Sequence, residues 1–226
     1  MFISEFTLAG PRANNEDVVF GVRLGDAESF GLVADGVGGV SGGKAAAECL
    51  KRAAEWHIAR KLYDPVAVLK MGHKLVNDLT SSTAATTASA VYCNGDSLIY
   101  AHTGDSRICV VRRNGIRTLT TDQTEVVQLL REGVLTKEAA KIYHRRNVLR
   151  HSIEKGQPLN LEDGRFALES GDRVILMTDG IYKLLSKETI RNESLKFSNP
   201  EDLRVALCEN VRDRLVDDAS LILLQV

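Results

Sequence analysis

The chain has 226 residues, of which 44% are hydrophobic and 26% charged, and its formal net charge is −1. This composition is typical of a globular protein with a sizeable core, and the near-neutral charge offers no broad basic surface for nucleic acid or acidic membranes. No apolar run approaches the roughly 20 residues of a membrane-spanning helix, and no signal-peptide pattern opens the sequence. Four scattered cysteines without a C-x-x-C pair favour buried thiols over zinc ligands or disulfides. We therefore expect a cytoplasmic protein.

The N-terminal third predicts two strands followed by two helices. Residues 17–24 and 29–34 are rich in β-formers and flank a Gly-Asp turn. Residues 43–62 are alanine-rich and carry apolar side chains on one helical face. Residues 65–79 repeat that pattern, with Pro65 in the first turn, where proline is tolerated.

The middle of the chain predicts a different structure. Residues 86–120 alternate polar and apolar side chains and contain two Asn-Gly dipeptides, which predicts an antiparallel meander with hairpin turns. Residues 124–143 return to a helical pattern, with Thr136 as an N-cap.

The C-terminal third alternates strands and helices. A strand is expected over 172–179, a helical segment over 181–190, a helix from Pro200 to about residue 216, and an apolar strand over 219–226. Strands grouped in hairpins and helices in consecutive pairs favour an α+β fold with antiparallel sheets and outer helices. No repeat or linker divides the chain, so we expect one domain, 1–226.

Residues Gly38–Lys44 match the phosphate-loop pattern G-x-x-x-x-G-K between a strand and a helix. A phosphate loop needs Ser or Thr after the lysine to hold Mg²⁺, and here that residue is Ala45. Phosphate-loop proteins also have a mostly parallel sheet, and the hairpin-rich centre of this sequence contradicts such a sheet. A nucleotide-binding protein remains an alternative at this point.

Aspartates stand at the ends of four apolar strands, at Asp35, Asp105, Asp179 and Asp217. A single aspartate there is usually a turn or cap residue. If four such carboxylates meet, they repel one another unless a cation lies among them. Ligands that are all oxygen select Mg²⁺ or Mn²⁺ over zinc.

The segment RANNED at residues 12–17 adds a further element. Arg12 offers a planar fork for phosphate oxygens, and Glu16 and Asp17 can hold water at a metal. These residues form a candidate phosphate clamp, with a solvated loop as the alternative.

In this order, the segments resemble the type 2C metal-dependent protein serine/threonine phosphatases, the PPM family. The family's motifs R-x-x-N-E-D, D-G-x-G-G, G-D-S-R, S/T-D-G and D-D/N-x-T/S correspond to RANNED (12–17), DGVGG (35–39), GDSR (104–107), TDG (178–180) and DDAS (217–220). The resemblance extends over nearly the whole chain and is closest to single-domain bacterial members. It implies a four-layer αββα sandwich: two antiparallel sheets flanked by helix pairs, with a dinuclear metal site at one edge. Residues 129–149 look like the family's flap.

The resemblance also implies a set of metal ligands for Mn²⁺ or Mg²⁺. Asp35 would bridge two ions, Asp179 and Asp217 would complete one of them, and the Gly36 carbonyl with Glu16 would hold the other.

Other roles follow from the same resemblance. Asp105 would form a third, weaker site with Asp179, Arg12 would bind the substrate phosphate, and Asp17 would orient Arg12 or a metal-bound water. The implied reaction is hydrolysis of phosphoserine and phosphothreonine by direct attack of a hydroxide that bridges two metals.

The implied partners are phosphorylated proteins, among them a serine/threonine kinase or its substrates, with no nucleic acid and no membrane, and the protein is expected to be a monomer. The chain departs from the family at Val37, where some members carry a histidine, and at Gln123, where the family usually has histidine. A non-catalytic regulatory module of the same fold and a two-metal phosphodiesterase are the alternatives.

Overall fold

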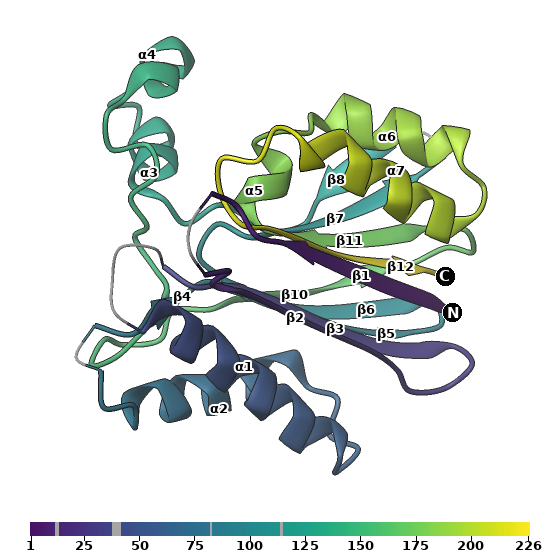
Figure 1. The fold of residues 1–226 in the computed structure, drawn as a ribbon, viewed down its shortest axis with the longest axis horizontal. Helices are drawn as coiled ribbons and strands as arrows, with labels where there is room; N and C mark the ends of the chain where they lie inside the picture. Colours follow the sequence, from purple (N-terminus) through teal and green to yellow (C-terminus); the bar gives the residue numbers. More distant parts are fainter. Residues whose placement is uncertain (12–13, 38–41, 82, 114) are drawn as a thin grey trace.

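The computed structural model describes residues 1–11, 14–37, 42–81, 83–113 and 115–226. Within these residues it contains two five-stranded sheets and one two-stranded ribbon, and the strands are paired antiparallel throughout. Figure 1 shows the two sheets stacked face to face, with helices on both outer sides.

The first sheet has the order β1-β12-β11-β7-β8. Its strands are β1 (Phe2–Leu8), β12 (Ala219–Gln225), β11 (Arg173–Met177), β7 (Arg107–Arg112) and β8 (Gly115–Thr118). The two ends of the chain are adjacent strands of this sheet (Figure 1).

The second sheet has the order β10-β6-β5-β3-β2. Its strands are β10 (Glu162–Ala167), β6 (Ser97–Thr103), β5 (Ala88–Asn94), β3 (Glu28–Asp35) and β2 (Asp17–Arg23). The ribbon pairs β4 (Ala85–Thr86) with β9 (Ile153–Glu154).

Two helix pairs cover the outer faces of the sheets. The pair α1 (Gly43–Ile58) and α2 (Pro65–Asn77) packs on the second sheet, and the pair α6 (Lys187–Lys196) and α7 (Pro200–Arg212) packs on the first (Figure 1). A third apolar cluster fills the space between the sheets. Burial of three apolar layers therefore produces four layers of structure.

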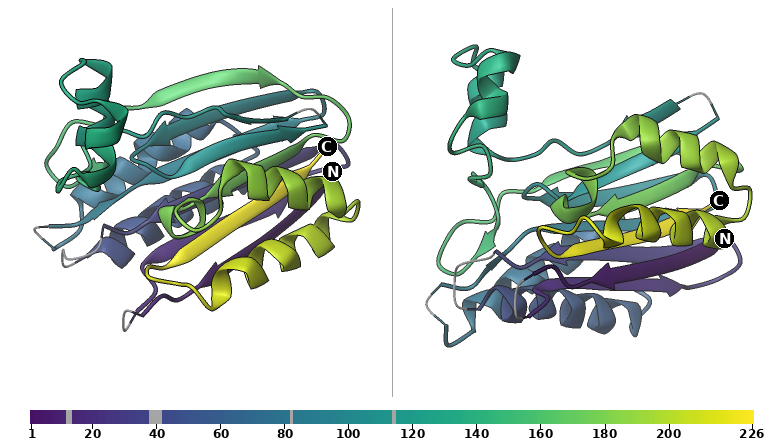
Figure 2. Two further views of the ribbon diagram at one scale, coloured as in Figure 1. Left: turned by 90° about the horizontal axis from the view of Figure 1, so that it is seen from above. Right: turned by 45° about the horizontal axis from the view of Figure 1, so that its top comes forward.

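Three short helices lie at one end of the sandwich. They are α3 (Glu125–Arg131), α4 (Lys137–Ile142) and α5 (Asp179–Tyr182). Figure 2 shows α3 and α4 projecting away from the sheets. We use the name flap for residues 124–149, which contain the segment 129–149 expected from the resemblance. Thr136 caps α4 as predicted, because its Oγ1 accepts a hydrogen bond from the Ala139 amide at 3.2 Å.

The predicted α+β class and the four-layer sandwich are confirmed. Some predicted boundaries were wrong: α1 ends at Ile58, four residues early, and Lys61 beyond it has a left-handed φ of 57°. The helical segment expected at 181–190 is divided between α5 and α6. Strands β1, β9 and β10 were not predicted. No helix among the described residues is long and apolar enough to cross a membrane.

Candidate metal centre

Four aspartates from separate elements line one cavity of about 230 Å³. Asp35 ends β3, Asp105 lies in the turn between β6 and β7, Asp179 begins α5, and Asp217 precedes β12. The two sheets therefore bring together the four strand-end aspartates that the sequence singled out.

The cluster is electrostatically strained. Burial, reinforced by the charges of Asp17, Asp179 and Asp105, holds the pKa of Asp35 well above its usual value. Burial and the charge of Asp179 raise the pKa of Asp105 to about 6. A cation among these carboxylates would remove the repulsion and lower both pKa values.

Asp17 lies directly behind the cluster, opposite Asp35 in the β2–β3 pairing. Its Oδ2 accepts a hydrogen bond from Thr178 Oγ1 at 2.8 Å. Burial nevertheless raises its pKa to about 7. Its other oxygen, Oδ1, is buried and accepts no hydrogen bond from the described residues, and the same holds for Oδ1 of Asp179. Buried carboxylate oxygens without protein donors suit a cation or its bound water.

The carboxylates surround the cavity but do not converge on one point. Among the described residues, no three His, Cys, Asp or Glu side chains form a ready-made metal-binding group. Instead, Asp179 Oδ2 accepts a hydrogen bond from Lys183 Nζ at 2.6 Å. The donors are all oxygen, so the residues present fit hard divalent cations such as Mg²⁺ or Mn²⁺.

Gly36, whose carbonyl is an expected metal ligand, lies between two segments of backbone. Its amide donates to the Glu16 carbonyl at 3.3 Å, and a Cβ on it would lie 2.6 Å from the carbonyl carbon of Gly43. The Asp-Gly pair therefore lets β3 end against the start of α1, next to Glu16. The Glu16 carboxylate and the Gly36 carbonyl remain predicted ligands, and Arg12 lies outside the described residues.

Asp218 was not among the predicted site residues. This carboxylate is 3% exposed, and its two oxygens accept hydrogen bonds from the amides of Gly10 and Glu16, each at 2.8 Å. It therefore fixes the segment that carries Glu16 against the start of β12. Its position beside Asp217 in the DDAS motif was the one sign in the sequence that Asp218 belongs to the site. Its hydrogen bonds to Gly10 and Glu16 could not be predicted, because these residues lie 208 and 202 positions away in the chain.

Gln123 explains one departure from the family pattern. Its Oε1 accepts hydrogen bonds from the Gly104 amide at 3.0 Å and the Thr103 hydroxyl at 3.2 Å. The backbone N–H of Gln123 donates to the Gly104 carbonyl at 2.8 Å. A glutamine thus holds the turn that presents Asp105.

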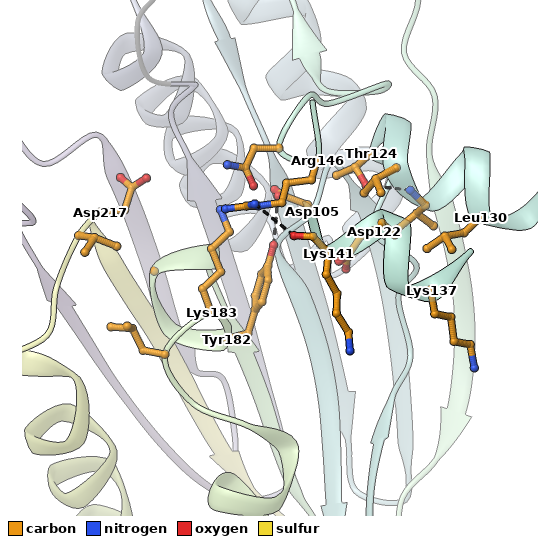
Figure 3. Close-up of a pocket in the computed structure, with 17 residues that line it drawn as sticks. Asp105, Asp122, Thr124, Leu130, Lys137, Lys141, Arg146, Tyr182, Lys183 and Asp217 are labelled. Atoms are coloured by element: carbon orange, nitrogen blue, oxygen red, sulfur yellow. Dashed lines mark hydrogen bonds between the residues drawn. The ribbon is translucent and has the colours of Figure 1, made fainter. Parts of the chain in front are cut away.

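A second cavity, of about 620 Å³, lies between the flap and α5 and shares Asp105, Asp217 and Lys183 with the first (Figure 3). The flap contributes the cations Lys137, Lys141 and Arg146 to its lining. This cavity thus leads from the flap to the aspartates and presents positive charge along the way.

Residues 144–151 are rich in cationic and histidine side chains, which lie in different surroundings. Arg145 pairs with Glu125 at 2.8 Å and so ties the end of the flap to the start of α3. Arg146 lines the 620 Å³ cavity, whereas Arg150 and His151 line a different one. These cations therefore do not act as one surface.

The raised pKa values predict how stability depends on pH in EDTA. Asp17 and Asp105 bind protons more tightly in the folded protein, with pKa values of about 7 and about 6, than in the unfolded chain, where the value is about 3.9. Their protonation therefore stabilises the fold fully below about pH 4, and this contribution is lost as the pH rises through the folded values. Thermal unfolding from about pH 4.5 to about pH 8 is expected to show a falling Tm, with the loss reversed by Mn²⁺. A Tm that Mn²⁺ shifts equally at both ends of the range would contradict this.

The sequence profile of the family described as Protein phosphatase 2C matches residues 12–209. The chain belongs to this family. Among protein phosphatase 2C relatives, protein phosphatase PhpP of Streptococcus pneumoniae is 30% identical over 209 residues, which cover 85% of this chain and 83% of PhpP. The serine/threonine protein phosphatase PstP of Mycobacterium tuberculosis is 31% identical over 196 residues, which cover 79% of this chain and 36% of PstP.

Solved protein phosphatase 2C structures agree with the fold. The serine/threonine phosphatase of S. agalactiae superimposes with a TM-score of 0.88 at 26% identity, covering 100% of this chain and 99% of that one. The catalytic domain of PstP, solved in complex with two manganese ions, gives a TM-score of 0.81 at 25% identity, covering 98% and 96%.

The phosphate-loop alternative loses its support. The sheets are antiparallel, and Lys44 donates through Nζ to the Asp17 carbonyl at 2.8 Å. Residues 38–41 of that pattern lie outside the described residues.

Proposed function

We propose that this protein hydrolyses phosphoserine and phosphothreonine in proteins and depends on two Mn²⁺ or Mg²⁺ ions. The observation that carries the proposal is that Asp35, Asp105, Asp179 and Asp217 line one cavity in a protein phosphatase 2C chain. PstP, whose catalytic domain was solved with two manganese ions, supports the number and kind of ion.

The residues that would hold the ions come from four separate segments at one edge of the sandwich. Asp35 would bridge the ions, Asp179 and Asp217 would complete one, and the Gly36 carbonyl with Glu16 would complete the other. When bound, two such ions polarise the phosphoryl group and acidify water at neutral pH.

The chain's own groups position the reactants. Asp17 is fixed through Oδ2 by Thr178, and its Oδ1 is left to accept a hydrogen bond from water or from Arg12. Arg12, at the position of the motif arginine, would bind the substrate phosphate through its fork of N–H donors. All four cysteines are buried and free, so none is placed to act as a nucleophile.

The surroundings fit a phosphorylated protein as substrate. The 620 Å³ cavity beneath the flap is lined by three flap cations and by Asp105 and Asp217, which suits an anionic segment. We place the reaction in a reducing, cytoplasmic compartment, in keeping with the buried free thiols. We also propose that residues 1–226 act as one domain and that the protein counteracts a serine/threonine kinase.

Purified protein is expected to hydrolyse a phosphothreonine peptide and p-nitrophenyl phosphate with Mn²⁺ or Mg²⁺, and to lose that activity in EDTA. The same peptide with phosphotyrosine is the control for substrate class, and slower release of phosphate from it is expected. Full turnover in EDTA would contradict the metal site. Binding of Mn²⁺ without turnover of either substrate would favour the non-catalytic module instead.

A further inference from the structure

Lys183 extends its ammonium group into the aspartate cluster. It follows α5 directly and lies four residues after Asp179, so the two side chains share one side of the helix. Its Nζ lies 2.6 Å from Asp179 Oδ2, and the lysine side chain is 37% exposed against 14% for the aspartate. Figure 3 shows Lys183 directed into the cavity beside Tyr182.

The same ammonium acts on two further aspartates. The charges of Asp105 and Asp217 both act on Lys183, and Lys183 acts on Asp105 in return. Among the described residues that line the 230 Å³ cavity, Lys183 is the one cationic side chain, and it faces four carboxylates.

Asp105 has a second protein partner. The hydroxyl of Tyr182 donates to Asp105 Oδ2 at 3.1 Å, and the Tyr182 ring stacks under the Arg107 guanidinium, 3.6 Å from the ring centroid. Arg107 is in turn held by two bonds to Asp122, at 2.8 and 2.6 Å. Asp105 and Asp179 are therefore bound by two consecutive residues, Asp105 by Tyr182 and Asp179 by Lys183.

The ammonium competes with a divalent ion for one part of this cavity. A third ion would need the Asp105 and Asp179 carboxylates, and Lys183 already supplies a positive charge there, 2.6 Å from Asp179 Oδ2 and acting on Asp105. A third divalent cation next to Asp105 and Asp179 would lie close to Lys183 and meet net repulsion.

We propose that the Lys183 ammonium replaces a third divalent cation at the Asp105–Asp179 pair, so that this protein binds two ions and not three. The inference deepens the proposed function and rests on its metal site. Lys183 is a positioning residue here: it holds Asp179 in place and neutralises its charge.

The test counts bound Mn²⁺ by native mass spectrometry and isothermal titration. Lys183→Met removes the charge while keeping the length of the side chain, and Lys183→Arg is the matched control that keeps the charge. Lys183→Met is expected to bind one Mn²⁺ more than the unsubstituted protein, and Lys183→Arg the same number. Lys183→Gln provides a second neutral variant if the methionine variant does not fold.

Equal ion counts in the unsubstituted protein and the neutral variant would overturn the proposal, and so would an extra ion in Lys183→Arg. A phosphothreonine-peptide assay on the same samples separates this result from the proposed function. If the neutral variant gains an ion while the unsubstituted protein shows no turnover with Mn²⁺, the role of Lys183 stands and the proposed function fails.

Discussion

Asp35→Asn is expected to reduce kcat/KM for a phosphothreonine peptide by more than about 100-fold, since even residues that only support a metal ligand typically cost 10–100-fold. Asp35 is the carboxylate on which the charges of Asp17, Asp179, Asp105 and Asp217 all act. The amide keeps the shape of the side chain but removes the negative charge that would bridge two cations. Steady-state kinetics at saturating Mn²⁺ measure the loss.

The same substitution is expected to raise the Tm in EDTA above neutral pH, because it removes one of the repelling charges. This opposite effect on activity and stability separates loss of the site from loss of the fold. Asp26→Asn is the matched control, since the Asp26 side chain is fully exposed and pairs with Arg23 at the surface; it is expected to change neither quantity. An Asp35→Asn variant with normal turnover would contradict the assigned site.

Asp218→Ala is expected to lower the free energy of unfolding by about 3 kcal/mol, since each hydrogen bond to a charged group contributes about 1.5–3 kcal/mol. The substitution leaves the amides of Gly10 and Glu16 without their acceptor. It also releases the segment that carries Glu16, so activity is expected to fall although Asp218 is not a predicted metal ligand. Urea denaturation measures the stability, and the peptide assay measures the activity.

Asp163→Ala, an exposed aspartate on β10, is the control for this change and is expected to stay within about 0.5 kcal/mol of the unsubstituted protein. Unchanged stability in Asp218→Ala would show that the two amides find other acceptors. Normal activity in a destabilised variant would show that Glu16 does not need this anchor.

Much of the fold followed from local patterns. Apolar side chains on one face predicted α1 and α2, and alternation with Asn-Gly turns predicted the hairpins of the meander. These predictions hold because a helix or hairpin buries its apolar face with residues that are near in the chain. Strands β1 and β10 escaped prediction because their partners, β12 and β6, lie far away in sequence. Strand β10, with three charged residues in six, carries little apolar signal.

The candidate site was also predictable only in part. The sequence by itself determined the chemistry of its aspartates, because the residue type and its position at the end of an apolar strand can be read from neighbouring residues. Only the tertiary structure decided which groups meet: Asp218 on the amides of Gly10 and Glu16, Thr178 on Asp17, and Lys183 among the carboxylates. These contacts depend on the edges of two sheets lying side by side, and burial of the layers between and outside the sheets creates that arrangement.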